Sequence, residues 1–440
     1  MKNYIPILVL ALLSPLVLLA QTQPFSLEEC IEYALNNSTD IARSQNNVLL
    51  QNVYLEQAKA SSLPNLQLGV TQQLTSTGNY NSTGGEWNRN SNSTLNASLN
   101  SQMTLYNGAK IKNTILQNNI NLESAELSIQ AERELISLNI LSFYIDALLA
   151  KENLQNSQLQ LEATQKQLTF AQVRHEAGVI SRSDLLYIKS QLASDKTSKI
   201  EAESNMRIAL VSLMQIMNMP INDSFNIQQP NIENIIKQRT KNNPETVYNV
   251  ALGLQPNIHT AELNVKSAEV EINIAKSGVL PSLMLNGGLG TGYSSNINNI
   301  NFGEQFSNSI APYVGLSLSI PIYQRKQAKT QIKTAQIQTS NTKLELTDMK
   351  NNLRKYIEQA CTDEQTAQSN YTALQEQLEA EQESYEVTIE MFSQGMVNSV
   401  DFLVSKNNLI TAENKFTQAK YKLVLQNKIV EYYLGKPIEL

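Results

Sequence analysis

Hydrophobic residues recur every seven positions in the first half of the chain. They are Ile140, Ala147, Leu154, Leu161 and Leu168. A period of seven is typical of helices that pack along a seam against another helix, rather than around a globular core. The surrounding stretch, residues 109–217, contains one glycine, Gly178, and no proline. The pattern predicts two antiparallel helices joined at Gly178, the first of them roughly 100 Å long at about 1.5 Å per residue.

The second half of the chain repeats the landmarks of the first half at a shift of 217 residues. Gly178 corresponds to Gly395, and Asp184 corresponds to Asp401. The seven-residue seam also recurs, at Tyr371, Leu378, Tyr385 and Phe392. Because glycine, aspartate, proline and tyrosine landmarks align without a gap, the sequence indicates a tandem duplication. A second helical hairpin is therefore expected, with its tip at Gly395.

Hydrophobic and neutral polar residues alternate before each long helical stretch. They do so over residues 64–106, around a loop expected at 78–94, and over residues 281–323, around a loop expected at 295–310. The apolar positions are Leu66, Leu68, Val70, Leu95, Ala97, Leu99, Met103, Leu105, Leu283, Leu285, Leu289, Val314, Leu316, Leu318, Ile320 and Ile322. A period of two predicts one β-hairpin in each half, with strands of about 10 to 12 residues.

Two interpretations of these hairpins are open. The strands could form a half-buried sheet packed on helices, or they could cross a membrane with the apolar side toward lipid and the polar side toward a wet lumen. Tyr106 and Tyr323 end the hairpins where interface aromatics belong in a membrane barrel, and Pro321 fits only near a strand end. Four strands cannot close a barrel, so the membrane interpretation requires an oligomer.

The chain divides into an N-terminal segment, two repeats and a linker. Residues 1–20 combine one lysine, an apolar run and a terminal small residue, which predicts a secretory signal peptide, with an uncleaved membrane anchor as the alternative. We expect repeat 1 over residues 21–220, a linker over 221–243 and repeat 2 over 244–440. Each repeat begins with a helix, the first of which is expected over residues 26–60 and ends before Leu-Pro.

Composition argues against several classes of function. The net charge is −6 and the basic residues form no cluster, which argues against nucleic-acid binding. The two histidines, His175 and His259, have no partners at metal-ligand spacing, and the glycines of 285–293 precede no helix start. Cys30 and Cys361 occupy non-equivalent positions, which favours isolated thiols over a disulfide. We therefore expect no catalysis, no metal and no cofactor.

The two hairpin tips are candidate docking sites. Capping explains part of their sequence, because a glycine ends one helix and an aspartate completes a capping box at the start of the next. Capping does not require apolar residues at these turns, however. Such residues are present as Val179, Ile180, Met396 and Val397, and we expect them to be exposed. Exposed apolar residues on a distant tip suggest docking to a partner.

In order, the features are a signal peptide and two gapless repeats. Each repeat has a helix, Leu-Pro, a β-hairpin that ends in Leu-Tyr or Ile-Tyr, a long helix and a Gly-x-x-[Ser/Asn]-x-x-Asp tip. This order resembles the TolC family of outer-membrane efflux channels over essentially the whole mature chain. The resemblance implies an α+β membrane protein that forms a homotrimer. Its four strands per protomer would build one twelve-stranded transmembrane β-barrel, continuous with a long antiparallel coiled-coil helical barrel in the periplasm.

The same resemblance implies partners and site residues. A periplasmic adaptor protein bound to an inner-membrane transporter would contact the tips at Gly178, Val179, Ser181, Gly395, Met396 and Asn398. Asp401 and Asp184 would line the periplasmic entrance, which in the family is closed at rest and opens by an iris-like movement. Some family members carry an acidic and a basic residue where this chain has Val404 and Val397, so a double acidic ring and a locking ion pair are not implied here.

Three functions compete. The first is an outer-membrane export channel, a passive exit duct for small molecules or drugs in the outer membrane of a Gram-negative bacterium. The second is a type I protein secretion duct of the same family, which only the neighbouring pump would distinguish. The third is a periplasmic coiled-coil adaptor or structural rod, which would show one helical hairpin flanked by compact β domains. In a channel, a threefold ring of Asp401 carboxylates would attract cations and raise the pKa values of its own members.

Overall fold

The computed structural model describes residues 24–233, 236 and 242–440. The expected signal peptide, residues 1–20, and part of the expected linker lie outside the described residues. The chain forms two compact units. Unit 1 comprises Met1–Thr39, Glu134–Val250 and Ile357–Leu440, and unit 2 comprises Asp40–Arg133 and Ala251–Tyr356. The two longest described helices, α3 (Lys110–Glu176) and α9 (Gln327–Ser393), contribute residues to both units.

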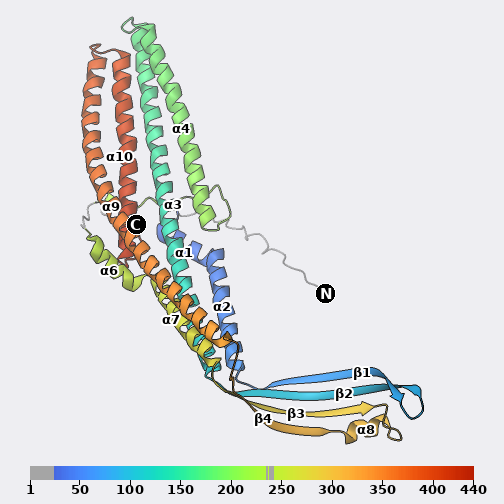
Figure 1. Cartoon of the computed structure of the whole chain (residues 1–440). Helices are drawn as coiled ribbons and strands as arrows, with labels where there is room; N and C mark the ends of the chain where they lie inside the picture. The colour runs from blue at the N-terminus through green and yellow to red at the C-terminus, as the bar shows by residue number, and fades with distance from the viewer. Residues whose placement is uncertain (1–23, 234–235, 237–241) are drawn as a thin grey trace, which may run out of the picture. The chain divides into compact units, whose positions relative to one another are not determined.

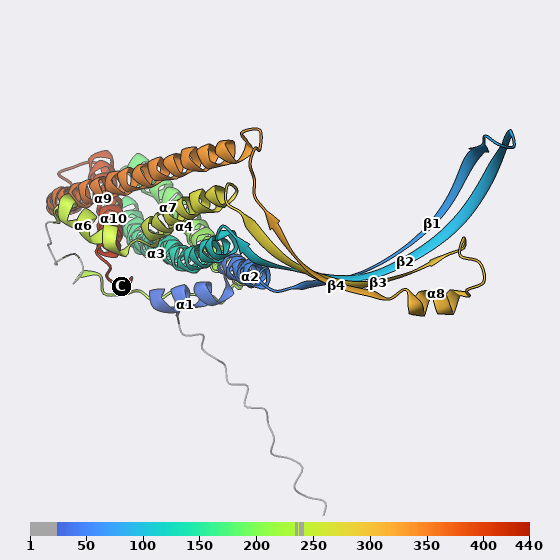
Figure 2. The ribbon, with the colours of Figure 1, turned by 60° about the horizontal axis from the view of Figure 1, so that its bottom comes forward.

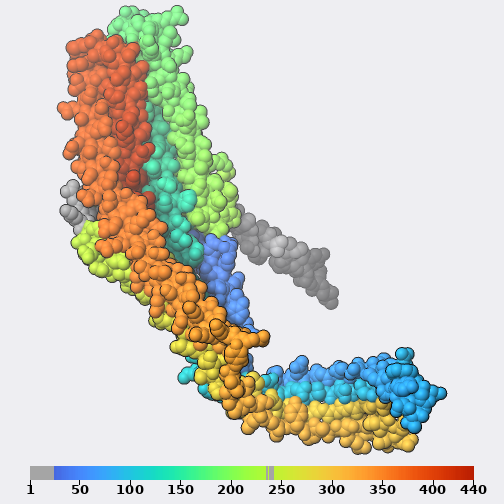
Figure 3. Space-filling view, viewed as in Figure 1, coloured from blue at the N-terminus to red at the C-terminus, as the bar shows by residue number. Residues whose placement is uncertain are grey.

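Unit 1 contains two helical hairpins, as the seven-residue period predicts. The first joins α3 to α4 (Arg182–Ile216), and the second joins α9 to α10 (Ser399–Tyr433). Figures 1 and 3 show the α9–α10 hairpin beside the α3–α4 hairpin. The shorter helix α1 (Leu27–Asn37) also belongs to this unit, and α6 (Pro244–Leu254) begins in it and ends in unit 2.

The core of unit 1 is built on α3. The seam positions Ile140 and Ala147 are fully buried, and so is Tyr144 between them. The Tyr144 hydroxyl lies 3.0 Å from the carbonyl oxygen of Phe25 and 2.7 Å from that of Gln228. One buried hydroxyl therefore attaches both the N-terminal segment and the segment after α4 to the middle of α3.

The helix expected over residues 26–60 is two helices. Helix α1 ends at Asn37, Ser38 is extended, and α2 (Thr39–Ala60) follows. The corresponding segment of the second half is split in the same way into α6 and α7 (Pro256–Ser277), because Pro256 has no amide hydrogen to continue α6. A continuous helix was therefore the wrong prediction for these segments.

Helix boundaries in the two halves differ by a constant shift. Helices α1, α2, α3 and α4 begin at residues 27, 39, 110 and 182, and α6, α7, α9 and α10 begin at 244, 256, 327 and 399, each 217 residues later. Their last residues differ by the same 217. The landmarks found in the sequence thus correspond to equal helices in the structure.

Unit 2 combines helices with a sheet. In its helical part, α7 packs between α3 and α9, because its polar side chains contact both. Gln117 of α3 donates to Glu271 of α7 (3.0 Å), and Lys350 of α9 pairs with Glu262 of α7 (2.9 Å). The sheet contains four antiparallel strands in the order β1-β2-β3-β4. They are β1 (Asn65–Asn81), β2 (Glu86–Asn107), β3 (Ser282–Ser294) and β4 (Ala311–Ser319).

The first β-hairpin is longer than predicted. The loop expected at 78–94 is wrong, because β1 and β2 stay paired up to Asn81 and Glu86 and only residues 82–85 form the turn. Gly85 has a φ of +71° in this turn. In the second hairpin the connection at 295–310 is present, and it contains a short helix, α8 (Phe302–Asn308), which Figure 2 shows beside the ends of β3 and β4.

The end of the second hairpin also differs from expectation. Strand β4 ends at Ser319, so Ile320, Ile322 and Tyr323 lie beyond the sheet rather than in a strand. Pro321 has no amide hydrogen for a strand ladder, which explains the early end. Tyr106, in contrast, lies within β2, next to an irregularity between Thr104 and Tyr106.

Candidate functional sites: the hairpin tips and the two-faced sheet

The first hairpin tip is a tight connection at Gly178. Gly178 has a φ of +75°, which any side chain would strain. The Val179 amide donates to the Arg174 carbonyl oxygen (2.8 Å) and closes the last turn of α3. The Ser181 hydroxyl then accepts from the Asp184 amide (3.1 Å), and the Asp184 carboxylate accepts from the Ser181 amide (3.2 Å). The capping box predicted at Ser181 and Asp184 is confirmed.

The second tip repeats the turn without the full capping box. Gly395 has a φ of +77°, and the Met396 amide donates to the Met391 carbonyl oxygen (2.9 Å). The Asn398 side-chain oxygen accepts from the Asp401 amide (2.9 Å). The Asp401 side chain is exposed, and within the described part of the chain its carboxylate accepts no hydrogen bond.

Asp184 connects the two tips to each other. The Ser399 hydroxyl, at the start of α10, donates to one carboxylate oxygen of Asp184. The Ser181 hydroxyl donates to the other oxygen (2.6 Å). Hydrogen bonds from Ser181 and then Ser399 lower the pKa of Asp184. The carboxylate of Asp184 is thus engaged within the protomer, whereas that of its counterpart Asp401 faces solvent.

Arg174 is a second link between the tips, and sequence reasoning missed it. Its guanidinium donates to the Phe392 carbonyl oxygen (3.0 Å) and lies over the rings of Phe170 (5.6 Å) and Phe392 (5.9 Å). The Phe392 ring stacks on Phe402 at 4.7 Å. A basic residue in the last turn of a helix ordinarily complements the helix dipole, so nothing in the sequence distinguished it.

The apolar tip residues are only partly exposed. Val179 is 60% exposed and Met396 is 68% exposed. Ile180 and Val397 are half-buried, and Ile180 packs on a cluster formed by Leu168, Ala171, Ile188 and Leu192. The expectation that all four project into solvent is therefore wrong for Ile180 and Val397.

A buried ion pair joins the hairpins away from the tips. The Lys406 ammonium of α10 lies 3.2 Å from an Asp195 carboxylate oxygen of α4, and each side chain is 4% exposed. The Thr164 hydroxyl of α3 contacts both charged groups, and the Gln191 amide donates to the other Asp195 oxygen (2.8 Å). Burial lowers the pKa of Lys406, and the Asp195 carboxylate opposes that shift.

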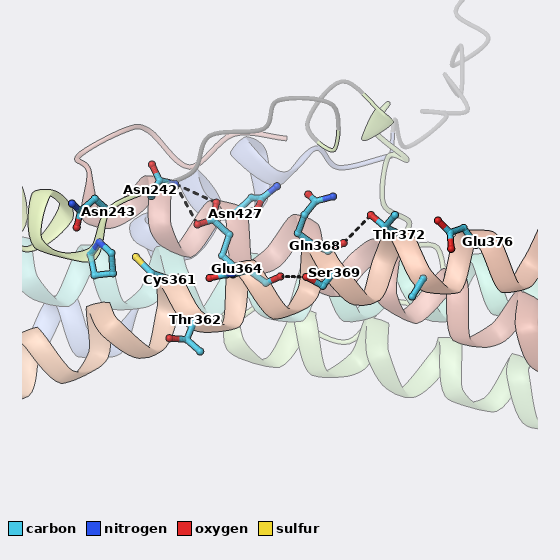
Figure 4. A pocket seen from close by; sticks show the side chains of 13 residues that line it. Asn242, Asn243, Cys361, Thr362, Glu364, Gln368, Ser369, Thr372, Glu376 and Asn427 are labelled. Carbon is cyan, nitrogen blue, oxygen red and sulfur yellow. Dashed lines mark hydrogen bonds between the residues drawn. The ribbon is translucent and has the colours of Figure 1, made fainter.

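A groove of about 890 Å³ lies along α9 in unit 1. Figure 4 shows Glu364 accepting from the Asn242 amide at 3.2 and 3.3 Å, while Ser369 and Thr372 donate to carbonyl oxygens of α9 itself. Burial raises the pKa of Glu364 and raises that of the Cys361 thiol to about 11. The polar groups of this groove thus form hydrogen bonds within α9 or with Asn242. Among the described residues no cluster has the composition of a metal site.

The sheet presents one apolar and one polar face across all four strands. The register aligns Leu68 with Leu99, and Leu99 with Leu289. The apolar residues on this face are Leu66, Leu68, Val70, Leu74, Leu95, Ala97, Leu99, Met103, Leu283, Leu285, Leu289, Val314, Leu316 and Leu318. Leu68 is 70% exposed and Leu316 is 65% exposed. Among the described helices only α8 lies on this face, at the end of β3, so most of its apolar side chains are uncovered, which does not fit a half-buried sheet packed on helices.

The opposite face is polar and almost uncharged. It carries Asn, Gln, Ser, Thr and Gly at most positions, and Glu86 beside the β1–β2 turn is its only charged strand residue. The Tyr313 hydroxyl donates to the Asn100 side-chain oxygen (3.0 Å), reaching from β4 over β3 to β2. Gly288 makes this contact possible, because a Cβ there would lie 3.0 Å from the Tyr313 ring and 2.5 Å from the Leu99 carbonyl oxygen.

The helices show no membrane-spanning segment. Within the described ranges, every helix is either too short or too polar to cross a bilayer.

Comparison with known proteins identifies the family. The model of outer membrane efflux proteins matches the chain twice, over residues 30–219 and 247–436. The chain belongs to the outer membrane efflux protein family. This family is a channel family and not an enzyme family, so the adaptor or rod alternative is wrong and the expectation of an outer-membrane export channel is confirmed.

Relatives of this outer membrane efflux protein cover nearly its whole length. The outer-membrane protein TolC of Escherichia coli (strain K12) is 24% identical over 448 residues, which span 99% of this chain and 87% of TolC. The structure of VceC from Vibrio cholerae matches with a TM-score of 0.77 and 16% identity over 94% of this chain and 97% of VceC. The CmeC outer membrane channel of Campylobacter jejuni matches with a TM-score of 0.74 and 18% identity over 94% of this chain and 86% of CmeC.

Proposed function

We propose that three copies of this chain form one passive export duct for small molecules. Each copy would contribute its four strands to a closed twelve-stranded barrel in the outer membrane and its helices to a tunnel in the periplasm. The duct performs no chemistry, and the energy for export comes from an inner-membrane transporter reached through a periplasmic adaptor.

The observation that carries this proposal is the exposed apolar face of a sheet with two unpaired edges. Among the described strands, β1 pairs only with β2, and β4 pairs only with β3. A lipid-exposed sheet edge leaves backbone groups without partners, at a cost of several kcal/mol for each group. Pooling strands from several copies pairs β4 of one copy with β1 of the next and removes both edges.

The dimensions agree with a membrane crossing. From Leu66 to Leu74 strand β1 advances roughly 27 Å at about 3.4 Å per residue. With the tilt usual in such barrels, this length approaches the apolar band of about 25 Å that outer-membrane barrels present to lipid. The polar faces of the strands would then line a lumen with few charges, so the barrel would present little electrostatic barrier to neutral, cationic or anionic solutes.

The tips are the proposed contact with the adaptor. Val179 and Met396 offer exposed apolar side chains at the ends of both hairpins. Gly178, Ser181, Gly395 and Asn398 hold the two turns in their observed shapes. Among the two aspartates, the open carboxylate of Asp401 is the better candidate to line the entrance. An inward-facing charge there would become a threefold ring.

A tandem duplication accounts for the two equivalent hairpins. The two matches to the family begin at residues 30 and 247 and end at 219 and 436, which again differ by 217. The helix boundaries carry the same shift. A duplicated gene explains how one protomer supplies two pairs of strands and two helical hairpins.

The proposal is tested by the native mass of the protein extracted in detergent from purified outer membranes. We expect a particle of about three protomers. A monomeric particle from the same membranes would overturn the pooled barrel. Protein secretion through the same duct remains the alternative, and co-purification of the transporter that completes the assembly would decide between the two cargo classes.

A further inference from the structure

The connection between β3 and β4 folds onto one particular face of the sheet. The Thr291 hydroxyl donates to the carbonyl oxygen of Phe306 in α8. Thr291 pairs with Ala97, and Ala97 pairs with Val70, so all three side chains point to the apolar face. Helix α8 therefore lies on the apolar side of the sheet, at the end of β3 farthest from the helices of unit 2 (Figure 2).

Aromatic contacts and a buried amide hold α8 in place. The Tyr293 ring, also on the apolar face, lies 5.2 Å from the Phe302 ring, which stacks on Phe306 at 5.5 Å. Gln305 is 5% exposed, accepts from the Ser294 amide (3.0 Å) and donates to the Ile300 carbonyl oxygen (3.0 Å). The β3–β4 connection is thus an ordered structure whose central polar groups are hydrogen-bonded, rather than an open loop.

The β3–β4 connection nevertheless exposes apolar side chains. The exposed fractions are 49% for Ile297, 44% for Ile300, 50% for Phe302 and 57% for Ile310. If the connection served only to attach the loop to β3, these exposed apolar side chains would add no stability, because loops in water favour polar residues at such positions. Their exposure continues the apolar face of the strands beyond Leu289, which is 45% exposed.

We propose that α8 and its flanking isoleucines form an interfacial anchor that inserts into the outer leaflet of the outer membrane, at the boundary between lipid headgroups and acyl chains. The occupant of the patch is lipid, since the patch is continuous with the exposed apolar face of the sheet. The inference rests on the proposed function, in which that face meets lipid. Short amphipathic helices with Phe and Ile on one side lie at this depth.

The polar groups of the connection agree with an interfacial depth. Asn301 caps α8 by accepting from the Glu304 amide (2.8 Å), and Glu304 is the only charged residue between 295 and 310. Asn301 and Glu304 are exposed, so both can reach the headgroup region while the rings of Phe302 and Tyr293 stay at the apolar boundary. The anchor would fix the vertical position of the barrel at the rim where β4 begins.

The test is fluorescence quenching by brominated lipids in phosphatidylcholine vesicles that contain the full-length protein. Trp87 is the only tryptophan, so Trp87→Phe provides a silent background for the probe Phe302→Trp. We expect a blue-shifted emission and loss of most of the signal with bromines near the headgroup end of the acyl chain. Bromines at the acyl terminus should quench less. If the Phe302→Trp variant fails to fold, Ile297→Trp in the same background makes the same measurement.

Two control probes separate this inference from the proposed function. Leu316→Trp lies on the apolar face of β4, and bromines at the acyl terminus should quench it. Tyr313→Trp lies on the polar face, and neither lipid should quench it. Quenching at Leu316→Trp without quenching at Phe302→Trp would overturn the anchor alone. Absence of quenching at Leu316→Trp would overturn the lipid-facing sheet itself.

The remaining outcomes identify another environment for α8. Quenching of the Phe302→Trp probe by aqueous acrylamide, without lipid quenching, would place α8 in water and overturn the anchor. Protection from both acrylamide and lipid would mean that a second copy of the chain covers the patch, which also overturns it.

Discussion

Lys406 and Asp195 lie 211 residues apart in the sequence, yet their charged groups are 3.2 Å apart in a place where each side chain is 4% exposed. The pair joins α10 of the second hairpin to α4 of the first, and Thr164 adds α3 to the contact. Because the two charges are buried in a largely apolar contact, we expect this pair to specify which turn of one hairpin meets which turn of the other.

Replacing one member of this pair should destabilise the helical part of the protein. Lys406→Met leaves the Asp195 carboxylate buried without its counter-ion, and such changes cost about 3–5 kcal/mol. The measurement is urea unfolding followed by circular dichroism. The double variant Lys406→Met with Asp195→Leu should recover most of the loss, because it removes both charges. A single variant as stable as the wild type would show that the pair does not join the hairpins.

The tip contact of Asp184 should weaken in acid. Its pKa is lowered in the folded protein from the ordinary value of 3.8. A lowered pKa adds stability that is present above the unfolded value and is lost as the pH falls through the folded value. Hydrogen exchange at the first amides of α4 should therefore accelerate below about pH 4.

Asp184→Asn should remove that pH dependence and loosen the first tip by about 1 kcal/mol, the usual size of a capping contribution. The equivalent change in the second repeat, Asp401→Asn, is the matched control. It should leave exchange at the start of α10 unchanged. Equal effects of the two variants would contradict the different environments of the two carboxylates.

Asp401 should instead influence ions in the open duct. If its carboxylates form a threefold ring, Asp401→Asn removes three charges from the entrance and should reduce both cation selectivity and block by divalent cations. Single-channel conductance in planar bilayers measures both properties. Unchanged selectivity and block would place Asp401 away from the conduction path.

Adjacent positions on one strand should respond oppositely to a charge. Leu68→Arg puts a guanidinium on the apolar face, where a charge near the middle of the bilayer costs about 2–4 kcal/mol in barrel proteins. Gln67→Arg puts the same group on the polar face. We expect lower amounts of heat-resistant oligomer in outer membranes for Leu68→Arg alone. The lipid-facing assignment would fail if Gln67→Arg were the more harmful change.

The spacing of hydrophobic residues and the 217-residue repeat predicted most of the architecture. The spacing from Ile140 to Leu168 indicated helices whose observed ends lie within a few residues of those expected, because glycine and proline punctuate the chain at its turns. The alternation at Leu66, Leu68 and Val70 indicated a two-faced strand. The extension of β1 to Asn81 was missed, because Asn, Ser and Gly favour loops when no partner strand is known.

The contacts between the two helical hairpins could not be predicted from the sequence. In the sequence, Lys406 and Arg174 look like ordinary solvent-exposed helix residues. Lys406 meets Asp195 and Arg174 meets Phe392 only because elements far apart in the chain pack together. Asp184 and Asp401 occupy equivalent positions in the sequence, but the Asp184 carboxylate accepts hydrogen bonds from Ser181 and Ser399, whereas the second tip has Asn398 in place of Ser181. Helix α8 was missed because seven residues carry too little periodicity for a prediction.

Strand β3 pairs with β2 only as far as Thr94. Beyond that point the first hairpin is a two-stranded ribbon, in which β1 pairs with β2 from Leu74 to Asn81. Among the described strands, only β1 and β2 pair beside the turn at residues 82–85. In the proposed barrel, substitutions and insertions in that turn would therefore spare the contacts between strands. If the proposed barrel places this turn outside an intact cell, antibodies would select against it, its sequence could vary fastest, and it would be a suitable position at which to display a foreign peptide on the bacterial surface.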